Sequence, residues 1–181
     1  EAAYYAFDEG RWRFVVLDTQ EVAIQGGWDE NSEQYRRSAA MLEALESAGA
    51  ENAVDFNGGL SDAQCRWLQR HLQQADAEGV NVLVFGHLPL VPVGEKHTAW
   101  NAETIVGMLE AHDCVKGYFC GHQHDGGYRQ EHGIHYVTFE AMVNAAGKGG
   151  AWAAVSVSEQ AILIEGIGPV PNRRLKIEHV G

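Results

Sequence analysis

The sequence predicts an α/β fold in which mixed sheets are flanked by helices. Apolar strands and amphipathic helices alternate between residues 61 and 120, which is typical of a β-α-β unit. After residue 126, short apolar segments separated by turns predict antiparallel hairpins. With 181 residues, 45% of them hydrophobic, the chain is long enough to bury a core, and we expect residues 1–181 to form a single domain.

The first elements are expected to be strands over residues 4–7 and 13–18. The second is a continuous apolar run, which is typical of a strand covered on both faces. Polar, glycine-containing residues 20–31 predict a loop. Apolar side chains at helical spacing, with Gly49 just beyond them, predict a helix over residues 32–48.

The middle of the chain predicts two strands separated by a helix. A capping box at its start predicts a helix over residues 61–78, and β-branched residues predict a strand over 80–86. A helix over residues 102–112, with Asn101 as its N-cap, then leads to a buried strand over 116–120. A crossover of this kind implies parallel pairing of the two strands, so their carboxyl ends should lie at the same edge of the sheet.

The last part of the chain predicts two hairpins. Residues 128–130 pair with residues 134–139, and residues 152–157 pair with residues 161–165. The tail from Gly168 onward contains two prolines and is expected to wrap the surface.

Both strands of the β-α-β unit end in the dipeptide Gly-His, at His87 and at His122, and His124 follows two residues later. Neutral imidazole is the commonest protein metal ligand, and ligands of open α/β sheets lie outside the carboxyl ends of the strands. The alternative is that these are unrelated loop histidines. Because the same pattern occurs twice, the sequence favours metal binding.

The loop over residues 91–101 follows one of these strand ends, where loops carry specificity. Lys96, His97, Trp100 and Asn101 are therefore candidates to contact a phosphate or to stack on a base. The alternative is a solvated loop in which Trp100 packs against the core.

Composition limits the partners. With 13 Lys and Arg against 25 Asp and Glu, the formal net charge is −12, which argues against a broad nucleic-acid surface. A small phosphorylated ligand stays open, because metal ions can supply positive charge locally. No stretch approaches the roughly 20 apolar residues of a membrane span, and three cysteines without a CxxC motif do not indicate a disulfide framework. We expect a cytoplasmic protein.

These motifs resemble those of a known family. Phe85-Gly86-His87-Leu88-Pro89 and Cys120-Gly121-His122-Gln123-His124 resemble the last two metal motifs of the calcineurin-like metallophosphoesterases. Within that superfamily the chain is similar to the manganese-dependent ADP-ribose/CDP-alcohol diphosphatase branch, from about Tyr4 to Arg173. The further segments that carry this similarity are Asn57-Gly58-Gly59-Leu60, Ala99-Trp100-Asn101 and Asp125-Gly126-Gly127-Tyr128.

The resemblance implies a fold and a chemistry. The fold would be part of a four-layer α/β/β/α sandwich. His87 and His122 would bind one divalent metal ion and His124 a second; Mn is favoured, with Fe and Zn as alternatives. His97, Trp100 and Asn101 would contact a nucleotide-type substrate such as ADP-ribose, whose phosphodiester or pyrophosphate bond would be hydrolysed by metal-activated water.

Three earlier motifs of the family are missing: an Asp-x-His, a Gly-Asp with the bridging carboxylate, and a Gly-Asn-His that carries the catalytic histidine. The resemblance therefore implies a carboxyl-terminal half, whose catalytic residue is unknown. In one hypothesis it is an enzyme, active when an amino-terminal half is supplied by the uncut gene product, another chain or a partner. In the other it is a non-catalytic metal-binding or interaction module, holding one ion or none, or a homo-oligomer. A phosphodiesterase or phosphomonoesterase of other specificity is a further rival.

Overall fold

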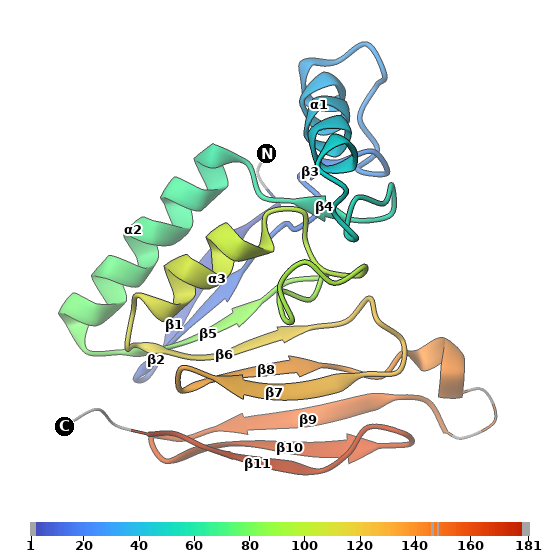
Figure 1. The fold of residues 1–181 in the computed structure, drawn as a ribbon. Helices are drawn as coiled ribbons and strands as arrows, with labels where there is room; N and C mark the ends of the chain where they lie inside the picture. The colour runs from blue at the N-terminus through green and yellow to red at the C-terminus, as the bar shows by residue number, and fades with distance from the viewer. Residues whose placement is uncertain (1–2, 146, 148, 179–181) are drawn as a thin grey trace.

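The computed structural model describes residues 3–145, 147 and 149–178, and within this part six strands form one mixed sheet, the large sheet (Figure 1). Its strand order is β1-β2-β5-β6-β8-β7. The strands are β1 (Tyr5–Glu9), β2 (Trp12–Val16), β5 (Asn81–Phe85), β6 (Val115–Cys120), β7 (Gly127–Glu131) and β8 (Ile134–Thr138).

The remaining described strands form two smaller sheets. Three antiparallel strands in the order β11-β10-β9 form the small sheet: β9 (Trp152–Val157), β10 (Ala161–Ile167) and β11 (Arg173–Lys176). A short antiparallel pair joins β3 (Val22–Ala23) to β4 (Gly58–Gly59). The helices are α1 (Glu33–Ser47), α2 (Asp62–Glu78), α3 (Ala102–Glu110) and the 3₁₀ turn η1 (Met142–Ala145).

The predicted parallel pairing of the β-α-β unit is confirmed. β5 pairs with β6 in parallel, with Phe85 opposite Phe119, and α3 crosses between them. β2 and β8 extend this parallel block on either side, and the antiparallel strands β1 and β7 form its two edges. The carboxyl ends of β5 and β6 therefore meet at one edge of the large sheet.

The N-cap predicted at the start of α2 is present, α1 has an N-cap of the same kind, and the cap predicted for α3 is absent. The hydroxyls of Ser32 and Ser61 accept hydrogen bonds from the backbone N–H groups of Tyr35 and Gln64, as N-caps do. Asn101 precedes α3 but makes no capping hydrogen bond. Its side-chain amide is engaged elsewhere, as described below, and the expected cap is absent for that reason. Among the described residues, no helix is long and apolar enough to cross a membrane.

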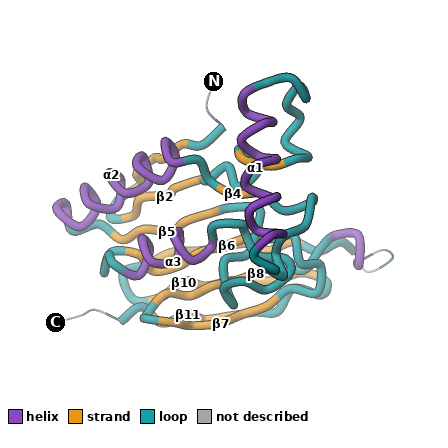
Figure 2. The backbone as a smooth tube through the Cα atoms, turned by 45° about the horizontal axis from the view of Figure 1, so that its top comes forward, coloured by secondary structure: helices purple, strands orange, loops and turns teal. Residues whose placement is uncertain are grey.

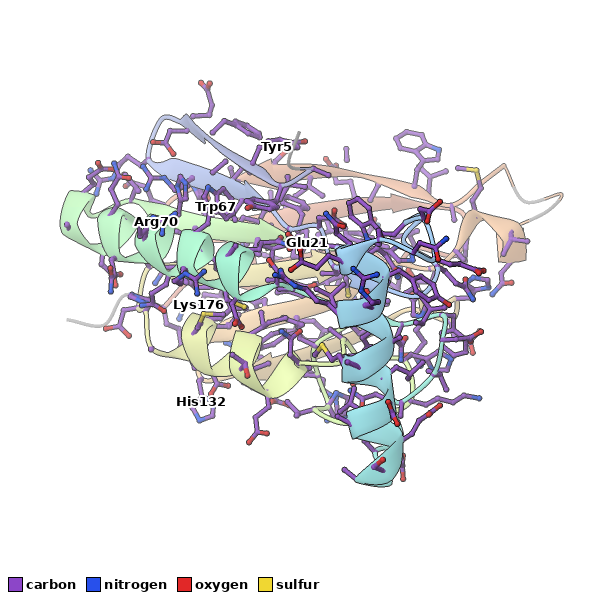
Figure 3. The ribbon with its side chains drawn as sticks, turned by 90° about the horizontal axis from the view of Figure 1, so that it is seen from above. Tyr5, Glu21, Trp67, Arg70, His132 and Lys176 are labelled. Atoms are coloured by element: carbon purple, nitrogen blue, oxygen red, sulfur yellow. The ribbon has the colours of Figure 1, made fainter. Side chains whose placement is uncertain are left out.

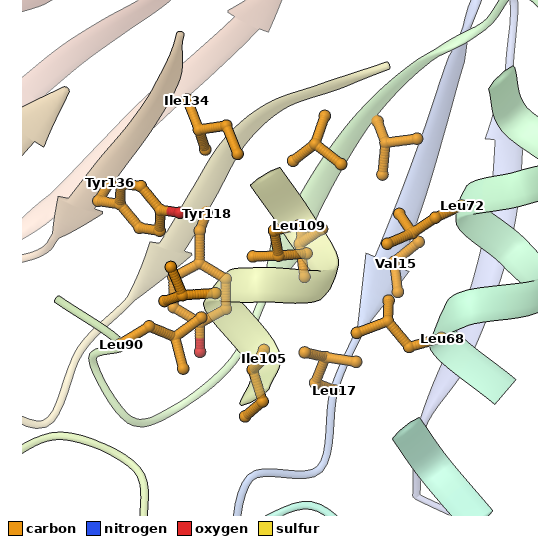
Figure 4. Close-up of a cluster of buried hydrophobic side chains, with 14 of the residues drawn as sticks. Val15, Leu17, Leu68, Leu72, Leu90, Ile105, Leu109, Tyr118, Ile134 and Tyr136 are labelled. Carbon is orange, nitrogen blue, oxygen red and sulfur yellow. The ribbon is translucent and has the colours of Figure 1, made fainter. Parts of the chain in front are cut away.

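The large sheet is buried by different partners on its two faces (Figure 2). Helices α2 and α3 cover one face, where Leu68 and Ile105 pack against Val15 and Tyr118 (Figure 4). The small sheet covers the other face. Full burial of such a side chain contributes about 1.5–3 kcal/mol, so these contacts fix the layers. The described residues thus supply a helical layer and two sheets of the expected four layers.

Some of the observed elements were not predicted from the sequence, β3 and β11 among them. The predicted loop over residues 20–31 contains β3, and the predicted irregular tail contains β11. In β11 and beyond, the buried residues Leu175 and Ile177 alternate with the exposed residues Arg174 and Lys176. This is the period of an edge strand with one buried face, and its charged residues concealed it in the sequence.

Candidate metal centre

The ends of β5 and β6 place His87 and His122 side by side. The backbone N–H of Gly121 donates to the carbonyl of His87 at 3.1 Å and so extends the pairing beyond the strands. Nδ1 of His122 lies 3.1 Å from Nε2 of His87. The rings meet edge to face, with 5.0 Å between their centroids.

The backbone around His87 is tightly held. A Cβ on Gly86 would overlap with the hydroxyl of Tyr118, so only glycine fits at this position. That hydroxyl donates to the carbonyl of Leu88 at 2.7 Å. The N–H groups of His87 and Leu88 both donate to Oγ1 of Thr19. Thr19 is buried and lies in the loop that follows β2. The turn that presents the His87 ring is therefore fixed by contacts from three segments.

His122 adopts an unusual backbone conformation, with φ of 66°. A non-glycine residue in this region costs on the order of 1 kcal/mol and persists only when its surroundings determine it. Here Gly121 precedes the residue, and the loop turns again at Gly126 with φ of 71°. The conformation directs the ring back between His87 and Phe56, whose ring centroid lies 5.5 Å from that of His122.

Asn57 determines which nitrogen of His122 carries the proton. Its Nδ2 donates to the carbonyls of Asn52 at 3.1 Å and Lys96 at 2.7 Å, so its Oδ1 is the atom that faces His122. Nε2 of His122 lies 3.1 Å from this oxygen and donates to it. The lone pair of neutral His122 is then on Nδ1, the nitrogen that faces His87.

The pair has the geometry and charge state that a metal ion needs. Two nitrogen ligands at about 2.1 Å from an ion, at a right angle, stand about 3 Å apart, as these two nitrogens do. Burial, together with His87, His97 and His124, lowers the pKa of His122 to about 4. Loss of surrounding water also lowers the pKa of His87. Both imidazoles are therefore neutral near pH 7, the form that binds metal.

The pair does not make a complete site by itself. In the part of the chain that the structure describes, no three His, Cys, Asp or Glu side chains are grouped so that they could hold an ion. The residues present thus fit a metal ion as a partial ligand set, with Asn57 as the outer partner that orients His122.

His97 and His124 border a pocket that His122 also lines. A cavity of about 420 Å³ is lined by Phe56, His97, His122, Gln123, His124 and Asp125. His97 stacks on Phe56 with 5.8 Å between ring centroids and lies 5.9 Å from His122. His124 and Asp125 are exposed at the rim of this pocket.

Trp100 and Asn101, which were candidates for substrate contact, are engaged by the chain itself. Trp100 is 4% exposed and its Nε1 donates to the carbonyl of Val54 at 3.2 Å. Oδ1 and Nδ2 of Asn101 bind the N–H and the carbonyl of Leu60 at 3.1 and 2.9 Å. Both side chains hold the loop after β5 against the segment around β4. Of the four candidates in this loop, which include Lys96, only His97 lines the pocket.

Sequence reasoning missed Asn57, Phe56 and Thr19. The sequence marks Asn57 only as the first residue of a segment similar to the family, and nothing in the local sequence indicates that its side chain is fully buried. The signal that exists is the family-like segment Asn57-Gly58-Gly59, in which an amide precedes the close approach of Gly58 to the carbonyls of Thr19 and Val22.

Comparison with known proteins agrees with the resemblance. No family model matches the chain. The manganese-dependent ADP-ribose/CDP-alcohol diphosphatase of Bos taurus is 31% identical over 94% of this chain, and that of Homo sapiens is 29% identical over the same share. A dimetal phosphatase from Danio rerio has a similar structure, with a TM-score of 0.88, 28% identity and 97% of this chain covered. These matches confirm both the resemblance and the fold class.

The matches cover nearly all of this chain but a much smaller share of each relative. This chain covers 54% of the Bos taurus protein, 53% of the Homo sapiens protein and 60% of the Danio rerio chain. The chain thus spans little more than half the length of the relatives it matches.

Proposed function

This chain is a relative of the manganese-dependent ADP-ribose/CDP-alcohol diphosphatases, and we propose that it supplies the histidine-bearing part of a two-metal phosphoesterase site. The complete site would hydrolyse a phosphodiester or pyrophosphate bond of a nucleotide-type substrate, such as ADP-ribose or a CDP-alcohol. Residues 1–181 would be one domain that lacks the amino-terminal motifs of the family.

The observation that carries this proposal is the pairing of Nδ1 of His122 with Nε2 of His87 at 3.1 Å, at the carboxyl ends of two parallel strands. A hydrogen bond between two neutral surface histidines would not need a buried amide to set the tautomer. Asn57 does set the tautomer of His122 and leaves the lone pair of Nδ1 directed toward His87, where an ion would take the place of the proton now shared with Nε2 of His87.

Each residue has a role in the proposed chemistry. His87 and His122 hold one ion, and His124, at the rim of the same pocket, contributes to the second. Two divalent ions, when bound, polarise the phosphoryl oxygens and activate water for attack on phosphorus. His97 and Phe56 offer stacked rings on which a base of the substrate can lie.

The alternative is a non-catalytic metal-binding module. It is favoured by the finding that no group of three potential ligands occurs within residues 3–145, 147 and 149–178. In this alternative the chain binds one ion weakly through the pair and catalyses nothing. The two proposals agree on the ligands and differ in turnover.

The test is metal content by elemental analysis together with hydrolysis of ADP-ribose under added Mn. If the chain retains Mn and turns over ADP-ribose, the enzyme proposal stands. Mn retention with no turnover, even when the amino-terminal segment of a diphosphatase relative is supplied, supports the non-catalytic module. Absence of Mn binding contradicts both.

We also propose a cytoplasmic location. Cys65, Cys114 and Cys120 are free thiols, two of them buried, as expected for a reducing compartment.

A further inference from the structure

Gln64 is a fully buried polar side chain in the first turn of α2. Its Oε1 accepts the N–H of Asp18 at 2.8 Å, and its Nε2 donates to the carbonyl of Asp18 at 3.0 Å. Nε2 also donates to Oε2 of Glu21 at 2.6 Å. A buried amide is costly unless it is hydrogen-bonded. These three bonds all go to the segment after β2, so the amide holds the chain where that strand has ended.

The segment held by Gln64 supports the main chain of His87. Main-chain pairing between β2 and β5 ends with the bond that the N–H of Leu17 donates. Two residues further on, Oγ1 of Thr19 accepts the N–H of His87 at 3.1 Å. Asp18 lies between them, with both of its main-chain groups bound to Gln64. The position of Thr19, and with it that of His87, therefore depends on the buried amide.

The same amide closes the base of the segment that reaches His122. Between β3 and β4 the chain leaves the large sheet and carries α1, and Asn57 immediately precedes β4. The N–H of Ser61 donates to Oε2 of Glu21 at 3.1 Å, the oxygen that Gln64 also binds. Figure 3 shows Glu21 between α1 and the start of α2. Asn57, which orients His122, thus stands beside a base that these bonds close.

We propose that Gln64 and Thr19 are positioning residues for the histidine pair. Gln64 fixes one base from which both rings are held, through Thr19 to His87 and through Glu21 to the segment that orients His122. Groups that bind an ion together must be held within about 0.5 Å of their working positions by supporting hydrogen bonds. The role rests on the proposed function, because the pair is the proposed metal site.

A purely structural role for Gln64 makes a different prediction. In that case the amide only fastens α2 to the sheet, and its loss lowers stability without changing metal affinity. Gln69 offers the comparison, because it lies on the same helix and its Nε2 is 2.8 Å from Nε2 of His112. His112 lies in the turn that leads into the amino end of β6, at the opposite edge of the sheet from His87.

The test is calorimetric titration of the 181-residue chain and its variants with Mn²⁺. Gln64→Met keeps the length of the side chain and removes its hydrogen bonds, and Thr19→Val removes the acceptor but keeps the shape. Each should lower Mn affinity about tenfold, the low end of the cost of losing an outer partner. Thr19→Ser keeps the acceptor and should restore the affinity to within about threefold of the parent, and Gln69→Met should leave it within about twofold. Thermal unfolding checks that every variant folds, and Thr19→Val carries the test if Gln64→Met does not fold.

A second readout needs no metal. In the metal-free chain, Nδ1 of His122 and Nε2 of His87 lie 3.1 Å apart and share a hydrogen bond. Long-range ¹⁵N–¹H spectra should show both signals shifted in Thr19→Val and unchanged in Gln69→Met. A structural role alone would leave them in place in both variants.

The inference is overturned if Thr19→Val leaves affinity and ring signals unchanged, if Thr19→Ser does not restore them, or if Gln69→Met matches Gln64→Met. Its failure is distinct from failure of the proposed function. Mn binding that His122→Asn abolishes and Thr19→Val spares would leave the proposed function standing. If the parent chain binds no Mn, the proposed function fails, and the ring signals of the metal-free chain decide the positioning role.

Discussion

His122 and His132 both have positive φ, 66° and 48°, and in the described part of the chain they are the non-glycine residues that do so. His132 and Gly133, with φ of 79°, form the two-residue loop between β7 and β8. Positive φ at both loop positions is what such tight hairpins require. The conformation of His132 is therefore explained by the chain immediately around it.

No hairpin explains His122. Its neighbours in space are Phe56, Asn57 and His87, which come from other parts of the chain. His132 is exposed, and its ring pairs with Glu110 on the surface. The same rare backbone conformation thus closes a hairpin at His132 and directs the ring of a proposed ligand at His122. Only the long-range contacts distinguish the two residues.

Substitution of each histidine by asparagine, which tolerates positive φ, separates the two roles. His122→Asn should lower Mn affinity by more than about 100-fold, beyond the 10–100-fold that loss of an outer partner costs, because a ligand is lost. His132→Asn should leave the affinity within about twofold, since a surface residue outside the site is changed. Calorimetric titration with Mn measures both. Equal losses would mean that the two histidines do not differ as described.

Substitution of Asn57 tests whether the residue that orients His122 affects Mn binding. Asn57→Ala should lower Mn affinity by about 10–100-fold, because His122 loses the acceptor that fixes its tautomer. It should also lower the free energy of unfolding by about 1–3 kcal/mol, because the carbonyls of Asn52 and Lys96 lose their donor. Asn172→Ala, which removes an exposed acceptor of the Gly166 N–H, is the control. Unchanged Mn affinity in Asn57→Ala would remove Asn57 from the site.

Gly86 tests how rigidly the His87 turn is held. Gly86→Ala should lower the free energy of unfolding by about 1–3 kcal/mol, because the added Cβ overlaps with the Tyr118 hydroxyl. Gly107→Ala, inside α3 with open space around it, should instead raise it by about 0.5–1 kcal/mol. Thermal unfolding compares the two. A neutral effect of Gly86→Ala would show that the turn adapts.

His122 also gives the metal-free protein a pH-dependent stability. The pKa of His122 is about 4 in the folded chain against an ordinary value of 6.5, so the unfolded chain binds its proton first as pH falls. The stabilising contribution is present above pH 6.5 and is lost on the way to pH 4. Because this shift is worth up to about 3 kcal/mol, the melting temperature of His122→Asn should fall less over this window than that of the parent chain, by up to about 10 °C. An identical fall would contradict the shift.

The two strands that carry His87 and His122, and their parallel pairing, could be predicted from the sequence. Continuous apolar runs that stop at Gly86 and Gly121 mark two strands, and a helix between them implies parallel pairing. The proximity of His87 and His122 follows from that topology. The structure confirms the pairing of the strands, and the roles of His87, His122 and His124 as ligands stay predictions.

The rest of the site depends on contacts between distant residues. Asn57 meets His122 across 65 positions and Lys96 across 39, so no local pattern announces it. The two interpretations of Trp100, tucked against the core or stacked on a base, were equally consistent with its loop sequence. In the structure Trp100 is buried, and its Nε1 donates to the carbonyl of Val54, 46 positions away.

We propose that one ion binds between Nδ1 of His122 and Nε2 of His87 while Asn57 keeps the other nitrogen of His122 protonated. Long-range ¹⁵N–¹H spectra of histidine-labelled protein, titrated with diamagnetic Zn²⁺, observe each ring nitrogen separately. We expect the signals of these two nitrogens to shift together at one equivalent, with Nε2 of His122 keeping its proton. Shifts confined to His132 and other exposed histidines, or a shift of His122 Nε2 instead, would contradict the account.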